Sequence, residues 1–228
     1  CIRRLGGLSM NLLPIAFILL GFLSGSILYS QYLPWHFKRI NIMEISEDHN
    51  PGTANVMKYA GVPLGIVCLV CDIGKGFVPV FLAMRFVRAE DMMVALILAA
   101  PVAGHAFSAF HQGRGGKAIA VTFGTLLGLW PDTQLFLVLC AFYLLFSVVI
   151  VIRPNERRTV FTFLCFGVAA LMQAYAGKLP LSVSLGAVGE AGIVIRKNLR
   201  GAKLPAVSVP TKPGQELGIE RVKEKDWK

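Results

Sequence analysis

The chain has 228 residues, of which 55% are hydrophobic and only 16% are charged. Soluble domains contain about 45 to 50% apolar and about 25% charged residues, so this composition argues against a soluble protein. The net charge is +10, but the basic residues are spread through short loops between apolar runs, which argues against a nucleic-acid partner. We therefore expect an all-α integral membrane protein.

Seven apolar segments approach the roughly 20 residues that a membrane-spanning helix needs. They lie at 11–33, 59–84, 92–110, 118–130, 133–152, 159–177 and 181–196. The fourth and the seventh are short, so either could be tilted, re-entrant or covered by its neighbours. The sequence thus predicts a membrane domain of about seven helices over residues 10–201.

The two ends of the chain are expected to lie outside this domain. Residues 1–9 precede a natural-looking start at Met10, so we treat them as a possible upstream segment. Residues 202–228 mix Lys, Glu, Pro and Gly without an apolar period, which is typical of a mobile tail.

The distribution of Lys and Arg predicts the orientation of the helices. Of 23 such residues, 17 fall on one side of the predicted spans, five fall on the other, and Lys75 lies within a span. The positive-inside rule then places the N-terminus outside the cell and the C-terminus in the cytosol.

A first polar cluster follows the first span. It contains Glu44, Glu47, Asp48, His49, Asn50, Gly52, Asn55 and Lys58. The turn at Asn50-Pro51-Gly52 can open the next helix, whose free amide groups suit an anion. His49 beside Asp48 offers a protein base. A plain solvated loop is the alternative.

A second cluster lies where the third span meets the fourth. It contains Gly104, His105, Arg114, Gly115, Gly116 and Lys117. Glycines let backbone amides converge on a phosphate, and a Lys at the opening of a helix adds a positive charge. The spacing differs from that of a Walker A loop, and a tight turn without a ligand is the alternative.

Asp72, Lys75 and Glu190 are charged-type side chains in the interior of predicted spans. Asp72 and Lys75 stand three residues apart on one helix face, close enough to pair. Ionisable groups at that depth are candidates for function, although a purely structural ion pair is the alternative. Glu190 is a lone carboxyl that is either protonated or paired with Lys75 or another cation. The five cysteines lie mostly in apolar runs and predict small core residues rather than a metal site.

Taken together, these clusters resemble the acyl-phosphate-dependent glycerol-3-phosphate acyltransferases, the PlsY family, over most of residues 10–201. The resemblance rests on Gly25-Ser26-Ile27, Asn50-Pro51-Gly52, Asn55, Asp72-Ile-Gly-Lys75-Gly76, Gly104-His105 with Phe107, and Gly115-Gly116-Lys117. It implies a seven-helix protein of the plasma membrane with its active-site loops in the cytosol. It also implies transfer of a fatty acyl group from acyl phosphate to the 1-hydroxyl of glycerol 3-phosphate, giving lysophosphatidate without a metal or coenzyme A.

The residues' own chemistry and this resemblance together predict the site. The expected catalytic residues are Asp48, His49, His105 and Asn198. The expected substrate-binding and phosphate-binding residues are Ser26, Asn50, Gly52, Asn55, Lys58, Arg114, Gly115, Gly116, Lys117 and Thr159. The expected partners are acyl phosphate, glycerol 3-phosphate or a related acceptor, and membrane lipid, while the oligomeric state stays open.

Several positions depart from the family pattern. Glu44 stands where the family has an Arg, Asp48 where it has a Ser, and Ile195 where it has a His. Lys58 keeps the charge of another family Arg but lacks its bidentate fork. Because carboxylates repel a phosphate dianion, we expect weak use of glycerol 3-phosphate. A divergent paralogue with another acceptor, or a non-catalytic anion-binding, lipid-binding or transport protein, is the alternative.

Overall fold

The computed structural model describes residues 9–201, so the predicted tail and most of the predicted upstream segment lie outside the described residues. The described part contains helices and no strand. Its α-helices are α1 (Ser9–Ser26), α2 (Tyr29–Lys38), α3 (Ile42–Ile45), α4 (Thr53–Ala60), α5 (Val62–Ala83), α6 (Met93–Ala106), α7 (Ile119–Leu127), α8 (Leu135–Leu144), α9 (Asn155–Tyr175) and α10 (Leu181–Gly201). A 3-10 turn η1 (Ala109–His111) follows α6, and a π-helical turn η2 (Leu145–Val149) follows α8.

Two of the predicted spans are divided differently in the structure. The first becomes α1 and α2, which together form one segment that is long and apolar enough to cross a membrane. The start of the second is separated as α4, because Gly61 adopts a φ of 99° and Pro63 follows in the first turn of α5. Positive φ values favour glycine, and Pro is readily accepted in the first turn of a helix.

The last two helices are longer than predicted. The helix expected at 159–177 already begins at Asn155, directly after Pro154, and its first turn carries Glu156. An acidic side chain in the first turn is favourable for a helix, and the polar start was excluded by a purely apolar criterion. The helix expected at 181–196 continues to Gly201.

Four helical segments of the described chain are long and apolar enough to span a membrane: Leu12–Lys38, Val62–Ala83, Met93–His111 and Asn155–Tyr175. Leu135–Val149 is a shorter apolar helix. The number of seven spans stays a prediction. Large apolar side chains are exposed on the outside of these helices, such as Leu19, Val70, Leu96 and Val168. Such a surface suits lipid better than water.

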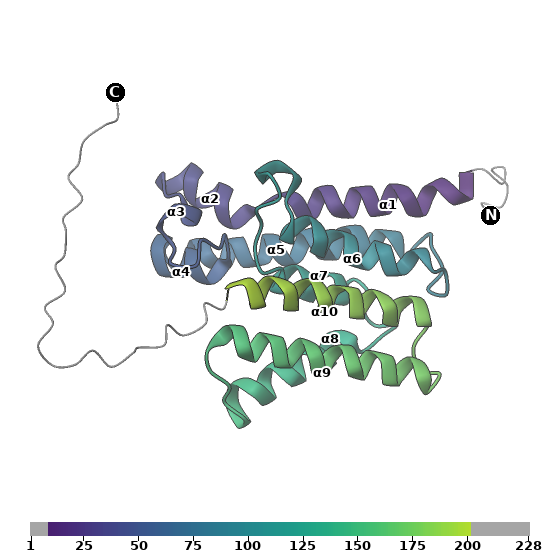
Figure 1. Ribbon diagram of the computed structural model, residues 1–228. Helices are drawn as coiled ribbons and strands as arrows, with labels where there is room; N and C mark the ends of the chain where they lie inside the picture. The colour runs from purple at the N-terminus through teal and green to yellow at the C-terminus, as the bar shows by residue number, and fades with distance from the viewer. Residues whose placement is uncertain (1–8, 202–228) are drawn as a thin grey trace, which may run out of the picture.

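The helices pack as an elongated bundle (Figure 1). The main contacts join α1 to α6, α6 to α10, α10 to α9, and α5 to α7. Glycines allow two of these approaches, since a Cβ on Gly104 would collide with the Phe22 carbonyl of α1 and one on Gly124 with the Ile73 carbonyl of α5. Small residues at helix contacts are characteristic of membrane bundles.

One end of the bundle carries the polar segments. Figure 1 shows α2, α3 and α4 at the end where α9 begins and α10 finishes, whereas α1 begins at the opposite end. A small apolar cluster of Ile42, Val56, Ala60 and Cys68 fixes α3 and α4 to α5. This arrangement brings segments that are far apart in the sequence to one place.

Candidate active site

A cavity of about 530 Å³ opens at this end of the bundle. Its walls come from the loop before α4 and α4 itself, the interior of α5, the end of α6, the start of α7, α8, the start of α9 and the end of α10. Ten of the residues predicted from the sequence line it: Asp48, Asn50, Gly52, Asn55, Lys58, Asp72, His105, Lys117, Thr159 and Asn198.

Hydrogen bonds fix the loop before α4. The Asn55 side-chain amide donates to Asp48 Oδ1 and to the Asn50 carbonyl, both at 2.8 Å, and the Asn50 backbone amide donates to Asp48 Oδ1 at 3.3 Å. Asp48 is therefore a rigid part of the wall. Its other oxygen, Oδ2, accepts a hydrogen bond from Lys117 Nζ.

Lys117 links the two sides of the cavity. Its Nζ lies 2.9 Å from Asp48 Oδ2 and 2.9 Å from Glu156 Oε1 of α9. Burial opposes ionisation at both ends of the Lys117–Asp48 pair, but the hydrogen bonds outweigh it. They raise the pKa of Lys117 above its usual value and lower the pKa of Asp48 below its usual value. Both groups are charged at neutral pH.

Lys58 has a carboxylate partner as well. Its Nζ lies 2.7 Å from Glu47 Oε1, with both side chains largely exposed. The hydrogen bond to Glu47 raises the pKa of Lys58 to about 12. Thus each lysine that was predicted to hold phosphate is already paired with one or two carboxylates.

An ion pair lies at the inner end of the cavity. Lys75 Nζ is 2.9 Å from Asp72 Oδ1, and each side chain is 2% exposed. Ser30 donates to Asp72 Oδ2 at 3.0 Å, and Lys75 donates to the Ile27 carbonyl at 2.6 Å. His105 Nδ1 is 4.0 Å from Asp72 Oδ1, which is too long for a hydrogen bond. Asp72 lines the cavity and Lys75 does not.

The glycine segment is held against α6. The Gly116 amide donates to the His105 carbonyl at 3.1 Å, and a Cβ on Gly116 would collide with the His105 ring. Lys197 of α10 donates to the carbonyls of Ala106 and Gly115. These contacts correct one expectation, because the Gly116 amide is used within the protein and is not presented to a phosphate.

Five further predicted residues lie outside the cavity. His49, Arg114 and Gly115 border a second, more open hollow of about 1020 Å³ together with Glu44. His49 Nδ1 is 2.8 Å from the Met43 carbonyl, so the expected base points away from the cavity. Ser26 and Gly116 line neither hollow. The Ser26 hydroxyl donates to the Phe22 carbonyl and accepts from the Ala109 amide.

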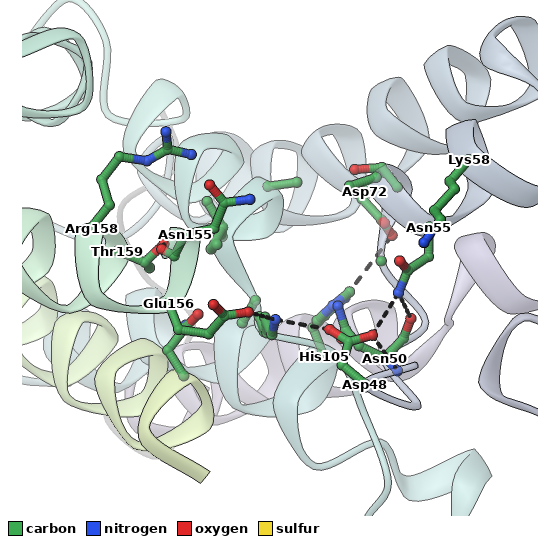
Figure 2. Close-up of a pocket in the computed structure, with 18 of the residues that line it drawn as sticks. Asp48, Asn50, Asn55, Lys58, Asp72, His105, Asn155, Glu156, Arg158 and Thr159 are labelled. Carbon is green, nitrogen blue, oxygen red and sulfur yellow. Dashed lines mark hydrogen bonds and ion pairs between the residues drawn. The ribbon is translucent and has the colours of Figure 1, made fainter. Parts of the chain in front are cut away.

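The side of the cavity formed by Tyr143 and the start of α9 was not predicted from the sequence. Tyr143, Asn155, Glu156 and Arg158 line the cavity, and Figure 2 shows Asn155, Arg158 and Thr159 across from Asp48, Asn50 and His105. The signal was the run Asn155-Glu-Arg-Arg at a helix start. Its basic residues were used only to predict the orientation of the helices in the membrane.

Glu190 is buried inside the bundle, away from this cavity. Thr125 Oγ1 donates to Glu190 Oε1 at 2.5 Å, and no ion pair within residues 9–201 includes Glu190. Lys75 pairs with Asp72 instead. The alternative in which Glu190 pairs with Lys75 is therefore wrong.

The apolar outer surface and the charged cavity at one end of the bundle define an integral membrane protein with a polar site close to the end of its helices. The chain belongs to the glycerol-3-phosphate acyltransferase family, whose model matches residues 15–200.

Curated relatives carry the same family name. A glycerol-3-phosphate acyltransferase of Thermotoga petrophila is 36% identical over 121 residues, which are 53% of this chain and 61% of that protein. One of Pseudomonas paraeruginosa is 38% identical over 124 residues, which are 54% of this chain and 62% of that protein. The matched segments thus span less than two thirds of these relatives.

The fold is similar to that of solved structures. A crystal structure of PlsY, described as an integral membrane glycerol 3-phosphate acyltransferase in its glycerol 3-phosphate form, superposes with a TM-score of 0.70. The match has 20% sequence identity and covers 82% of this chain and 88% of that chain. The lysophosphatidic acid form gives a TM-score of 0.68. At this identity the likeness shows a shared fold.

Proposed function

We propose that this protein is a membrane acyltransferase that moves a fatty acyl group from acyl phosphate to the 1-hydroxyl of glycerol 3-phosphate. The products are lysophosphatidate and inorganic phosphate. The observation that supports this most strongly is the convergence of three distant segments, around Asp48, His105 to Lys117, and Asn198, on one cavity. The family membership and the names of the relatives point to the same reaction.

The chemistry requires a hydroxyl to attack the acyl carbon and phosphate to leave. The transition state carries an oxyanion, which positive charge and polar donors stabilise. Lys117 and the Asn198 side chain are such groups in the cavity wall. The Asp48 and Glu156 carboxylates bind Lys117, and Asp72 binds Lys75. We therefore assign the hydroxyl proton to a phosphate oxygen of a substrate rather than to a protein base.

We place the cavity at the cytosolic face of the plasma membrane. The excess of basic residues on the side of the α2–α4 end supports this orientation. A reporter fused after Lys228 should then be found in the cytosol. Labelling of that reporter from outside the cell would overturn the orientation and the placement of the cavity.

The direct test uses purified protein in detergent with long-chain acyl phosphate as donor. Formation of lysophosphatidate and phosphate from glycerol 3-phosphate supports the proposal, with acyl coenzyme A as the control donor that should give no product. Absence of product with acyl phosphate, while the protein stays monodisperse, would refute it.

A second candidate is the same transfer to an acceptor without a phosphate. The pairing of Lys58 with Glu47, and of Lys117 with Asp48 and Glu156, favours it because each lysine charge is balanced. Including glycerol and other neutral polyols in the assay distinguishes the two candidates. Faster turnover of a neutral polyol than of glycerol 3-phosphate would favour the second.

A further inference from the structure

The charges around the cavity are balanced in pairs with one exception. Four carboxylates line it, those of Glu47, Asp48, Asp72 and Glu156. Glu47 binds Lys58, Asp48 and Glu156 share Lys117, and Asp72 binds Lys75 behind the wall. The remaining cation is Arg158, whose guanidinium has no ion pair and no hydrogen bond within residues 9–201.

The guanidinium of Arg158 is positioned for a ligand. The side chain is half-buried, and its Nε is a buried donor without a partner. A buried donor without a partner is costly, so such a group in a cavity wall points to a ligand that is not part of the protein. Figure 2 shows no contact drawn to Arg158, in contrast to Asp48 and Glu156.

Polar neighbours complete this wall. Asn155 lies three residues before Arg158 on the same helix face, and its side chain is exposed. Tyr143 OH lies 3.4 Å from Thr159 Oγ1, and Thr159 itself donates to the Asn155 carbonyl at 2.9 Å. All of these residues line the cavity.

We infer that Arg158 binds the phosphate group of the acceptor substrate. The phosphate is then recognised by α9 rather than by Lys58 and Lys117, whose charges are balanced by carboxylates. The ligand class is a phosphate monoester. Arg suits this role because its planar fork can donate two parallel hydrogen bonds to a phosphate. This inference rests on the proposed function for the identity of the ligand. It adds a specificity-determining residue and implies that the phosphate-free acceptor is the poorer one.

Binding measurements test this without requiring turnover. Titration calorimetry in phospholipid-free detergent would compare glycerol 3-phosphate with glycerol for the native protein, Arg158→Gln, Arg158→Lys and Arg157→Gln. Arg157 is the matched control, since it is the exposed neighbour on the same turn and lines neither the cavity nor the second hollow. We expect Arg158→Gln to weaken glycerol 3-phosphate binding by about tenfold or more. Arg158→Lys should recover part of the loss, and Arg157→Gln should bind like the native protein.

Three results would overturn the inference. One is native-like affinity in Arg158→Gln. Another is an equal loss in Arg157→Gln, which would indicate only general attraction by positive charge. The third is competition by a lipid phosphate, which would then be the true ligand of Arg158. In that case the native protein would bind glycerol 3-phosphate more weakly in nanodiscs containing phosphatidylglycerol than in detergent, whereas the affinity of Arg158→Gln would be the same in both.

The acyl-transfer assay separates this inference from the proposed function. If the native protein makes lysophosphatidate and Arg158→Gln keeps the native acceptor KM, the role of Arg158 is wrong while the reaction stands. If glycerol 3-phosphate binds through Arg158 but acyl phosphate yields no product, the reaction is wrong while the phosphate site stands.

Discussion

The interior of the bundle and the rim of its cavity both hold lysine–carboxylate pairs, yet the pairs differ in burial. Asp72 and Lys75 are each 2% exposed. Lys117 and Asp48 are 18% and 30% exposed, and Lys58 and Glu47 are 57% and 84% exposed. Distances are similar, between 2.7 and 2.9 Å. Water screens an exposed pair and not a buried one. The interaction energies of these three pairs should therefore differ although their distances are similar.

The largest effect is expected from breaking the interior pair on one side only. Lys75→Met leaves the Asp72 carboxylate buried without its cation, which should destabilise the protein by about 3 to 5 kcal/mol. Thermal unfolding in detergent, followed by circular dichroism, measures this. The double variant Asp72→Asn with Lys75→Met leaves no charge unpaired and should unfold closer to the native protein. Equal losses in both variants would contradict the role of charge pairing.

The next effect concerns activity at the half-exposed cluster. Lys117→Ala removes two charge-assisted hydrogen bonds and one of the cations that line the cavity. A charge-assisted contact from Lys117 to the oxyanion is worth about 1.5 to 3 kcal/mol, so acyl transfer should fall by about tenfold or more. Lys178→Ala, exposed and outside the cavity, is the control. Native kinetics in Lys117→Ala would exclude Lys117 from the reaction.

A smaller effect is expected at Asp48. Asp48→Ser leaves Lys117 with Glu156 as its one carboxylate partner among the described residues, which should lower the acceptor KM for glycerol 3-phosphate a few fold. Glu44→Arg, by contrast, should have little effect, because Glu44 borders the second hollow and not the cavity. An unchanged or higher KM in Asp48→Ser would show that this carboxylate does not oppose the substrate.

The pH dependence of the Asp48 variant has a defined sign. The hydrogen bonds from Lys117 and Asn55 overcome the effect of burial and lower the Asp48 pKa below 3.8. The carboxylate is therefore fully charged at neutral pH, and its interaction is lost only as the pH falls through that lowered pKa. Titration of Asp48 itself should therefore add no pH dependence to the difference in KM between the native protein and Asp48→Ser across the neutral range.

The sequence allowed the helical membrane class and most of one cavity wall to be predicted. Asn50, Gly52 and Asn55 could be found because a turn before a helix has a local signature. The positions of His49 and Ser26 could not, since the contact of His49 with the Met43 carbonyl depends on how the loop turns back, and the contact of Ser26 with the Ala109 amide depends on how α1 packs against a segment 83 positions away. A residue type and its spacing do not determine on which side of a loop its side chain lies.

The α9 wall was missed for a different reason. The role of Glu156 depends on a distant partner, since Glu156 binds Lys117 across 39 positions of the sequence. A count of basic residues per side treats Arg157 and Arg158 as equivalent, although only Arg158 lines the cavity. Which of two adjacent arginines faces inward depends on the rotation of the helix, which is set by packing of Phe163 and Phe166 in the core.

The smallest effect is expected at the exposed pair. Glu47→Gln should leave the unfolding temperature near its native value, because Lys58 and Glu47 are both largely exposed to solvent and exposed ion pairs contribute little.

The ion pair between Lys58 and Glu47 should instead be visible in a titration of Lys58. The hydrogen bond to Glu47 raises the Lys58 pKa to about 12 from its usual 10.5, so NMR titration of Lys58 should show a lower pKa in the variant. A raised lysine pKa contributes stability below its usual value and loses it as the pH rises through the folded value. Any difference in stability should therefore be confined to pH values below about 12 and shrink with added salt. A loss in Glu47→Gln as large as that in Lys75→Met would contradict the conclusion that burial, rather than distance, determines the strength of these pairs.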